Sequence, residues 1–82
     1  MRTSRQTWII RSSSDFGRTI ADLRALRGIT QSDLAAQSGL PREYLARLER
    51  GLTVTMLERM LRLLRRLGAE VTVSIPTGDD DA

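Results

Sequence analysis

Apolar positions along the first half of the chain recur at helical spacing. In the first such stretch they are three or four residues apart, at Phe16, Ile20, Leu23 and Leu26. This spacing predicts a helix over 15–27 with one apolar face. Ser14 is expected to cap its first turn, where Asp15 also suits the helix dipole, and Gly28 is expected to end it.

Two short helices follow with only a few residues between them. Thr30 with Asp33 approximates a capping box, and Gly39 ends the helix that starts there after barely two turns. A third helix is predicted over 41–50, with Pro41 in its first turn, because a proline there gives up no hydrogen bond. Two short helices joined by a glycine-bearing turn form the layout of a helix-turn-helix.

A fourth helix is predicted over 55–67, with Thr55 and Glu58 as a second capping box. Its apolar side chains cover about 160° of a helical wheel, more than the ~100° of a helix that packs only against its own domain. They are Met56, Leu57, Met60, Leu61, Leu63, Leu64 and Leu67. The surplus predicts that part of this face packs against a second copy of the chain.

The segment 69–75 alternates between apolar and polar residues, which predicts a strand with one buried face, ended by Pro76. A lone strand leaves its backbone groups unpaired, so it needs a neighbour. The favoured partner is the same strand of a second copy, antiparallel across a two-fold axis, with the β-prone stretch 7–10 at the edges. The rival partner is 7–10 of the same or the other chain. The residues expected to hold the dimer are Met56, Met60, Leu63, Leu67, Val71, Val73 and Ile75.

Length and composition exclude several classes of function. At 82 residues the chain is expected to be one small domain, which buries little surface alone and gains from a second copy. It has no cysteine and no histidine, so it lacks a thiol nucleophile, the commonest general base and the commonest metal ligands. We therefore expect no enzyme activity, no cofactor and no metal. No signal peptide or membrane span is visible, so a cytoplasmic, nucleoid-associated location is expected.

The charge of the chain favours a polyanionic partner. All 13 basic residues are arginines, against ten acidic residues, and three of the acids are Asp79, Asp80 and Asp81. Without these three the net charge rises from +3 to +6, which suits nucleic acid better than an acidic protein surface. The alternative is that the arginine content reflects only genome composition.

Residues 31–50 meet the physical requirements of a DNA-reading helix pair. The inner position of the first helix must be small, and it is Ala35; the turn must accept a left-handed backbone, and Gly39 supplies it. On a helical wheel, the side chains of the third helix that point inward are Tyr44, Leu45 and Leu48. Those that point outward are Glu43, Ala46, Arg47 and Arg50, with Arg42 on the flank.

An outward face of arginines is what a helix needs to read the major groove of DNA. Arginine bonds bidentately to guanine, and glutamate accepts a hydrogen bond from cytosine. Gln31 and the N–H groups at the start of the second helix are placed to hold a phosphate. The alternative is an ordinary solvated face, on which Glu43 and Arg47 only form an ion pair with each other.

Residues 20–67 resemble the lambda-repressor/Cro-like (XRE) helix-turn-helix family. The resemblance lies in "LRGITQSDLAAQSGL" and "LARLERG", where the signature positions are Gln31, Ala35, Gly39, Leu45, Leu48, Glu49 and Gly51. It implies base reading by Arg42, Glu43 and Arg47, and phosphate contact by Thr30, Gln31, Tyr44 and Arg50. Pro41 stands where the family usually has a Ser or Thr cap, so one capping hydrogen bond is expected to be missing.

From about Trp8 to Ile75 the chain is also similar to the HipB-like antitoxins, because a β-prone segment precedes its first helix and a strand follows its fourth. This resemblance implies a homodimer that binds operator DNA, represses its own operon and neutralises a HipA-like toxin kinase. Two alternatives stay open. One is a stand-alone XRE-type regulator without a toxin, and the other is a protein-binding dimer whose helix-turn-helix does not read DNA.

Further expectations concern α-helical arginines outside the reading helix, single residues and the acidic tail. A solvated face, with DNA contact as the alternative, is expected for Arg59, Arg62, Arg65 and Arg66. Trp8 is expected to pack, with a docking anchor as the alternative, and Ser12–Ser14 to form a cap region rather than a catalytic group. Arg2 and Arg5 are expected to reach phosphates. The acidic tail is expected to aid solubility, with cover for a basic partner surface as the alternative.

Taken together, the pattern predicts an all-α helix-turn-helix domain of four to five helices, whose C-terminal strand forms an intermolecular sheet in a dimer. We expect an N-terminal arm over 1–14, the DNA-binding domain over 15–67, the dimerisation strand over 68–76 and the acidic tail over 77–82.

Overall fold

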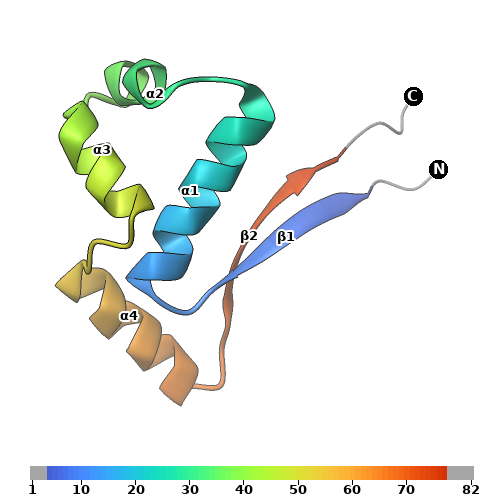
Figure 1. Cartoon of the computed structure of the whole chain (residues 1–82). Helices are drawn as coiled ribbons and strands as arrows, with labels where there is room; N and C mark the ends of the chain where they lie inside the picture. The colour runs from blue at the N-terminus through green and yellow to red at the C-terminus, as the bar shows by residue number, and fades with distance from the viewer. Residues whose placement is uncertain (1–3, 78–82) are drawn as a thin grey trace.

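The computed structural model describes residues 4–77, which form four helices and two strands. Along the chain these are β1 (Arg5–Ile10), α1 (Ser13–Arg27), α2 (Gln31–Ser38), α3 (Arg42–Glu49), α4 (Thr55–Arg66) and β2 (Val71–Pro76). Helix α1 lies between α3 and the two-stranded sheet, and α2 and α4 lie at opposite ends of the molecule (Figure 1). The predicted order of the helices and of the strand that follows them is confirmed. The expectations for Arg2 and for Asp79, Asp80 and Asp81 lie outside the described residues.

The turn between α2 and α3 has the predicted local chemistry. Thr30 Oγ1 accepts a hydrogen bond from the Asp33 N–H at 3.0 Å, and Asp33 Oδ2 accepts one from the Thr30 N–H at 3.3 Å, so the capping box is confirmed. Gly39 ends α2 in the left-handed conformation, with φ 73°. Pro41 has no side-chain cap hydrogen bond, as expected, but it precedes α3 at the N-cap position in an extended conformation, so its predicted place in the first turn is wrong by one residue. These local signals set where the two helices meet.

The predicted cap of α1 is wrong by two residues. The helix begins at Ser13, and Ser12 rather than Ser14 caps it by accepting a hydrogen bond from the Asp15 N–H at 3.1 Å. Ser12, Ser13 and Ser14 are all residues that commonly cap helices, so the sequence does not distinguish between them. Ser13 is needed elsewhere, because its side chain is buried against the start of α4.

The predicted cap of α4 is also wrong. The N-cap position is Val54, and no side chain caps it, so Thr55 and Glu58 form no capping box. The Glu58 carboxylate instead accepts a hydrogen bond from the Ser13 N–H at 2.6 Å, and Ser13 Oγ accepts one from the Val54 N–H at 2.9 Å. Glu58 therefore supplies the missing acceptor at the first turn of α1 rather than of its own helix.

The two strands pair with each other in an antiparallel ladder. Trp8 lies opposite Val73, and Ile10 lies opposite Val71. Strand β2 therefore has 5–10 of its own chain as one neighbour, which includes the rival partner that the sequence left open. Trp8 is half-buried and its Nε1–H donates a hydrogen bond to Asp22 Oδ2 of α1 at 3.0 Å, so it ties the sheet to α1.

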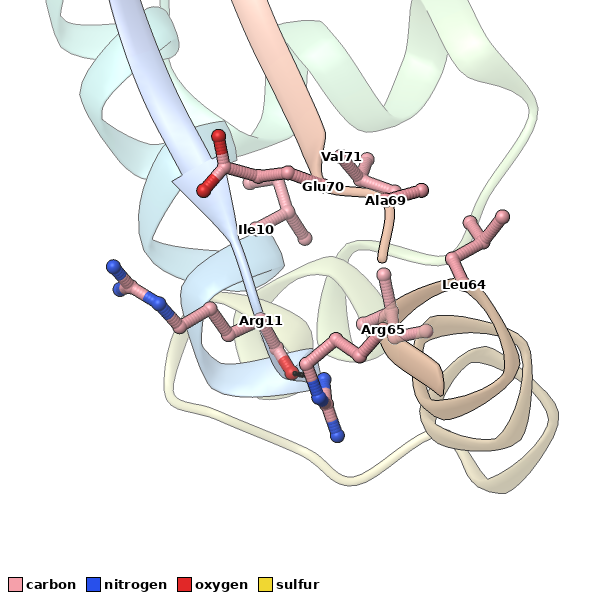
Figure 2. A pocket seen from close by; sticks show the side chains of 8 residues that line it. Ile10, Arg11, Leu64, Arg65, Ala69, Glu70 and Val71 are labelled. Atoms are coloured by element: carbon pink, nitrogen blue, oxygen red, sulfur yellow. Dashed lines mark hydrogen bonds between the residues drawn. The ribbon is translucent and has the colours of Figure 1, made fainter. Parts of the chain in front are cut away.

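The buried core of the described residues is small. Its apolar members are Ile10, Ala35, Leu45, Ala46, Leu48 and Leu61, and no large side chain among residues 4–77 is fully buried. Helix α4 contributes one of them, and it leaves large apolar side chains exposed at Met56, Met60, Leu63, Leu64 and Leu67. The C-terminal end of α4 is held by Arg65, whose Nη1 donates a hydrogen bond to the Arg11 carbonyl at 2.9 Å (Figure 2).

Candidate nucleic-acid interface

Helix α3 presents a polar face to solvent, but it is rotated from the orientation that its apolar residues predict. Leu45 and Leu48 are buried as expected, whereas Ala46 is buried rather than outward and Tyr44 is exposed rather than inward. The exposed side chains around this helix are Arg42, Glu43, Tyr44, Arg47 and Arg50. The inward and outward positions predicted for Tyr44 and Ala46 are therefore both wrong.

The reason for the rotation is a buried charge. Glu49 lies on the inward side of α3, between Ala46 and Leu48 in helical projection, with only 6% of its side chain exposed. Arg24 of α1 holds it with two hydrogen bonds of 2.9 Å, from Nε to Oε2 and from Nη2 to Oε1. A hydropathy pattern places every glutamate on the outside of a helix. The predicted buried face therefore excludes Glu49, and its centre lies too close to Tyr44.

The Arg24–Glu49 pair connects all three helices of the interface. Gln31, the first residue of α2, donates its Nε2–H to Glu49 Oε1 at 2.9 Å, and Arg24 Nη1 donates to the Ile29 carbonyl at 3.1 Å. The hydrogen bond from Arg24 lowers the pKa of the Glu49 carboxyl from its ordinary value; burial opposes this, and the bond from Gln31 adds to it. Glu49 is therefore ionised at neutral pH and fixes α3 relative to α1 and α2.

Acid is expected to weaken the fold through two carboxylates. The pKa of Glu58 is lowered as well, chiefly by the hydrogen bond from the Ser13 N–H. A carboxyl whose pKa is lower in the folded state stabilises the fold above its unfolded pKa, about 4.3, and loses that contribution as pH falls through the folded value. We expect the melting temperature to fall as pH decreases below about 4.5.

Thermal melts followed by circular dichroism from pH 7 to pH 3 test this expectation. In Glu58→Gln the stability at neutral pH should be lower and its decline toward acid shallower than in the wild type. An equal decline in both proteins would mean that Glu58 does not contribute.

Helices α1 and α3 approach most closely at Gly17. A Cβ atom built at this position would lie 1.7 Å from the Leu48 carbonyl oxygen and 2.7 Å from its carbonyl carbon. Gly17 is buried, and its contact is with backbone that cannot rotate away. The glycine therefore sets the distance between α1 and the helix that carries the exposed arginines.

The start of α2 and the start of α3 lie beside the same open hollow. It is lined by Arg24, Gly28, Ile29, Thr30, Gln31, Ser32 and Arg42. Among the described residues, the backbone N–H groups of Gln31 and Ser32 have no hydrogen-bond acceptor, as is usual in a first helical turn. The side-chain amide of Gln31 is engaged with Glu49, so its backbone N–H is the donor that it has left for a ligand. Free N–H donors beside an arginine suit an anion such as a phosphate.

The arginines on the exposed face of α3 have no partners among residues 4–77. The salt bridge between Arg24 and Glu49 is the only one in this part of the chain, so the alternative of an ion pair between Glu43 and Arg47 is wrong. The side chains of Arg42, Arg47 and Arg50 make no hydrogen bond there either. Their guanidinium groups are available to an external ligand.

Sequence reasoning missed two of the residues that build this surface. The sequence pattern places Gly17 within the first helix and Arg24 among thirteen arginines, and it assigns neither of them a role. A glycine in the middle of an amphipathic helix, where it costs about 1 kcal/mol relative to alanine, was the available signal for a close approach. No local signal identifies Arg24, because its partner lies 25 residues away.

Two short helices joined by a tight turn, with an arginine-bearing second helix held by a buried ion pair, have the layout of a helix-turn-helix. The model of the helix-turn-helix family matches residues 20–73, which is more than half of the chain. The chain belongs to this XRE-type helix-turn-helix family, and it is a DNA-binding transcriptional regulator. No curated protein and no solved structure matches it. None of the helices within residues 4–77 combines the length and the apolar character needed to cross a membrane.

Proposed function

We propose that this regulator is a repressor that binds a two-fold symmetric operator as a homodimer. Each protomer places α3 in one major groove, and the two half-sites lie about one helical turn of DNA apart. The observation that carries the proposal is the row of exposed arginines on α3, which have no ion-pair partner among residues 4–77 and are held in position by the Arg24–Glu49 pair. We infer from the resemblance to operator-binding regulators that the protein represses its own operon and acts in the cytoplasm.

The proposed contacts divide by chemistry. Base edges are read by Arg42, Glu43 and Arg47, all of which are exposed. Phosphates are contacted by groups at the start of α2 and on the flanks of α3, namely Thr30, Gln31, Tyr44 and Arg50. The exposure of Tyr44 supports its placement in this second group, because the hydroxyl of an inward tyrosine would not reach the DNA backbone.

Selection of binding sites from a random duplex library tests the operator. Duplexes that the protein enriches are expected to contain a near-palindrome and to bind far more tightly than unselected DNA, with an affinity that falls steeply with salt. Absence of enrichment together with equal binding to all duplexes would contradict sequence-specific repression. Absence of any salt-sensitive binding would favour the alternative of a purely protein-binding dimer.

Arg47→Ala is expected to weaken operator binding by roughly tenfold or more and to relax the preference at one base pair, because a bidentate contact to guanine contributes about 1–3 kcal/mol. Fluorescence anisotropy with the selected duplex and its single-base variants measures both effects. Arg66→Ala, which removes the same charge from the exposed end of α4, is the matched control. If Arg47→Ala weakens binding to random DNA equally, Arg47 contacts phosphate instead.

The more specific form of the proposal is an antitoxin that also neutralises a HipA-like toxin kinase. It is supported by the resemblance to HipB-like proteins and by the order of elements, with one strand before the four helices and one after them. The alternative is a stand-alone XRE-type regulator. Purification of the tagged protein from its native cells, with bound proteins identified by mass, separates the two. One stoichiometric partner with a kinase sequence supports the antitoxin, and recovery without a partner supports the stand-alone regulator.

A further inference from the structure

Two adjoining hollows lie among α1, α2 and α3, which form three sides of an angular frame (Figure 1). The outer hollow, of about 230 Å³, is lined by Ile20, Leu23, Arg24, Arg27, Ile29 and Leu34. The inner hollow, of about 240 Å³, shares Ile20 and Leu34 with the outer one and extends to Ala35, Ser38, Leu45 and Leu48. Because two side chains line both hollows, one ligand can occupy them together.

The inner hollow reaches the centre of the domain. Ala35, Leu45 and Leu48 make up half of the six buried apolar residues in the described part of the chain, and Leu45 is only 2% exposed. A space of 240 Å³ holds about eight water molecules at liquid density, whereas protein interiors have few voids larger than one. Apart from Ser38 the side chains around it are apolar. The inner hollow therefore suits hydrocarbon better than water.

The charged residues that line the two hollows are both arginines, Arg24 and Arg27. Arg24 is engaged with Glu49. Arg27 is exposed and forms no salt bridge within residues 4–77. No acidic side chain from this part of the chain lines either hollow. The charge beside the outer hollow therefore favours a ligand with an anionic group, for which Arg27 is the available donor.

We propose that the two hollows bind a small amphipathic carboxylate, with its hydrocarbon chain against Ile20 and Leu34 and its carboxylate bonded to Arg27. A guanidinium donates two parallel hydrogen bonds to a carboxylate, which orients the head group. A free small molecule fits better than a helix of a partner protein. The inner hollow is enclosed by buried residues and admits a hydrocarbon chain, whereas a helix with its side chains is at least about 10 Å across.

This site is separate from the proposed contacts with DNA. None of the residues proposed to touch bases or phosphates lines either hollow. Leu45 and Leu48 lie on the buried side of α3, and its exposed arginines lie on the other side. Ligand binding and operator binding are therefore measured independently, and the failure of one leaves the other standing.

Octanoate is the probe for this site, followed in ¹H–¹³C spectra of the methyl groups of the full chain. We expect saturable shifts at Ile20, Leu34 and Leu45, with a dissociation constant on the order of 1 mM or tighter. The methyl groups of Ile9, which is 38% exposed on β1, report on unspecific binding to apolar surface and should not shift. Acetate, which lacks the chain, should leave Leu45 unchanged. Octylammonium, which reverses the charge, should bind at least about tenfold more weakly than octanoate.

A matched pair of arginine variants tests the head group. Arg27→Gln is expected to weaken octanoate binding by about three- to tenfold, because it removes the charge that holds the carboxylate. Arg18→Gln is the control: Arg18 is also exposed on α1, and its position nine residues earlier places it on the opposite side of the helix. Its affinity for octanoate should stay within about twofold of the wild type.

Leu34→Phe tests the apolar part of the site, because the larger side chain fills space that both hollows share. It is expected to abolish the octanoate-dependent shift at Leu45, and circular dichroism confirms that the variant is folded.

Three results would each overturn the inference. The first is the absence of a saturable shift at Leu45 in the wild type, and the second is an equal shift at Ile9. The third is an equal loss of affinity in Arg27→Gln and Arg18→Gln. Equal binding of octylammonium and octanoate would overturn the assignment of an anionic ligand.

Discussion

Gly17→Ala is expected to lower the free energy of unfolding by more than about 3 kcal/mol, or to prevent folding. The added Cβ would lie 1.7 Å from the Leu48 carbonyl oxygen, so α1 and α3 would have to separate. Alanine gains about 1 kcal/mol over glycine in a helix interior, which offsets only part of this cost. Since a domain of this size is stabilised by roughly 4–12 kcal/mol, the loss is a large fraction of the total.

Urea denaturation followed by circular dichroism measures the effect, and Gly28→Ala provides the control. A Cβ at Gly28 meets no atom within 4 Å, but the residue has φ 67°, so its substitution costs about 1–2 kcal/mol in backbone strain alone. If Gly17→Ala were no less stable than Gly28→Ala, the close approach of α1 and α3 would not be essential to the fold.

Glu49→Ala is expected to lower the free energy of unfolding by about 2–4 kcal/mol and to weaken operator binding beyond what the lost stability explains. Removing the carboxylate leaves the Arg24 guanidinium, 22% exposed, without its partner, and leaves the Gln31 amide without an acceptor. The cost lies at the low end for a buried pair because water reaches Arg24. Binding suffers because this pair fixes α3 against α1 and α2.

The matched control is Glu43→Ala, which removes an exposed glutamate from the same helix and is expected to change stability by less than about 0.5 kcal/mol. The double variant Arg24→Met with Glu49→Met should recover much of the stability lost in Glu49→Ala, because no unpaired charge stays buried. Equal stability of Glu49→Ala and Glu43→Ala would show that the ion pair contributes nothing.

The two substitutions act on one property of the molecule, the position of α3. Gly17 sets how closely α3 approaches α1, and Glu49 sets its rotation about its own axis. The arginines that face outward depend on both, although neither residue touches DNA in the proposed complex. When each variant is measured under conditions in which it is folded, a loss of DNA binding therefore reports on the position of α3 rather than on a lost contact with DNA.

The sequence by itself determined the elements of this fold, because the signals involved are local. The capping box of Thr30 and Asp33, the left-handed turn at Gly39 and the uncapped Pro41 were all readable from neighbouring residues, and so was the helix-turn-helix layout. The arginines of the predicted reading helix were likewise identified as exposed from the pattern alone.

Tertiary structure decided what the local pattern could not. Glu58 bonds to Ser13 rather than to its own helix, and β2 takes β1 of the same chain as a neighbour. The rotation of α3, with Tyr44 outward and Ala46 inward, follows from the burial of Glu49 by a partner in α1. A periodicity analysis assumes that charges face water, and only a contact across 25 residues shows that this one does not. The chain thus encodes its helices locally and orients its reading helix through long-range pairing.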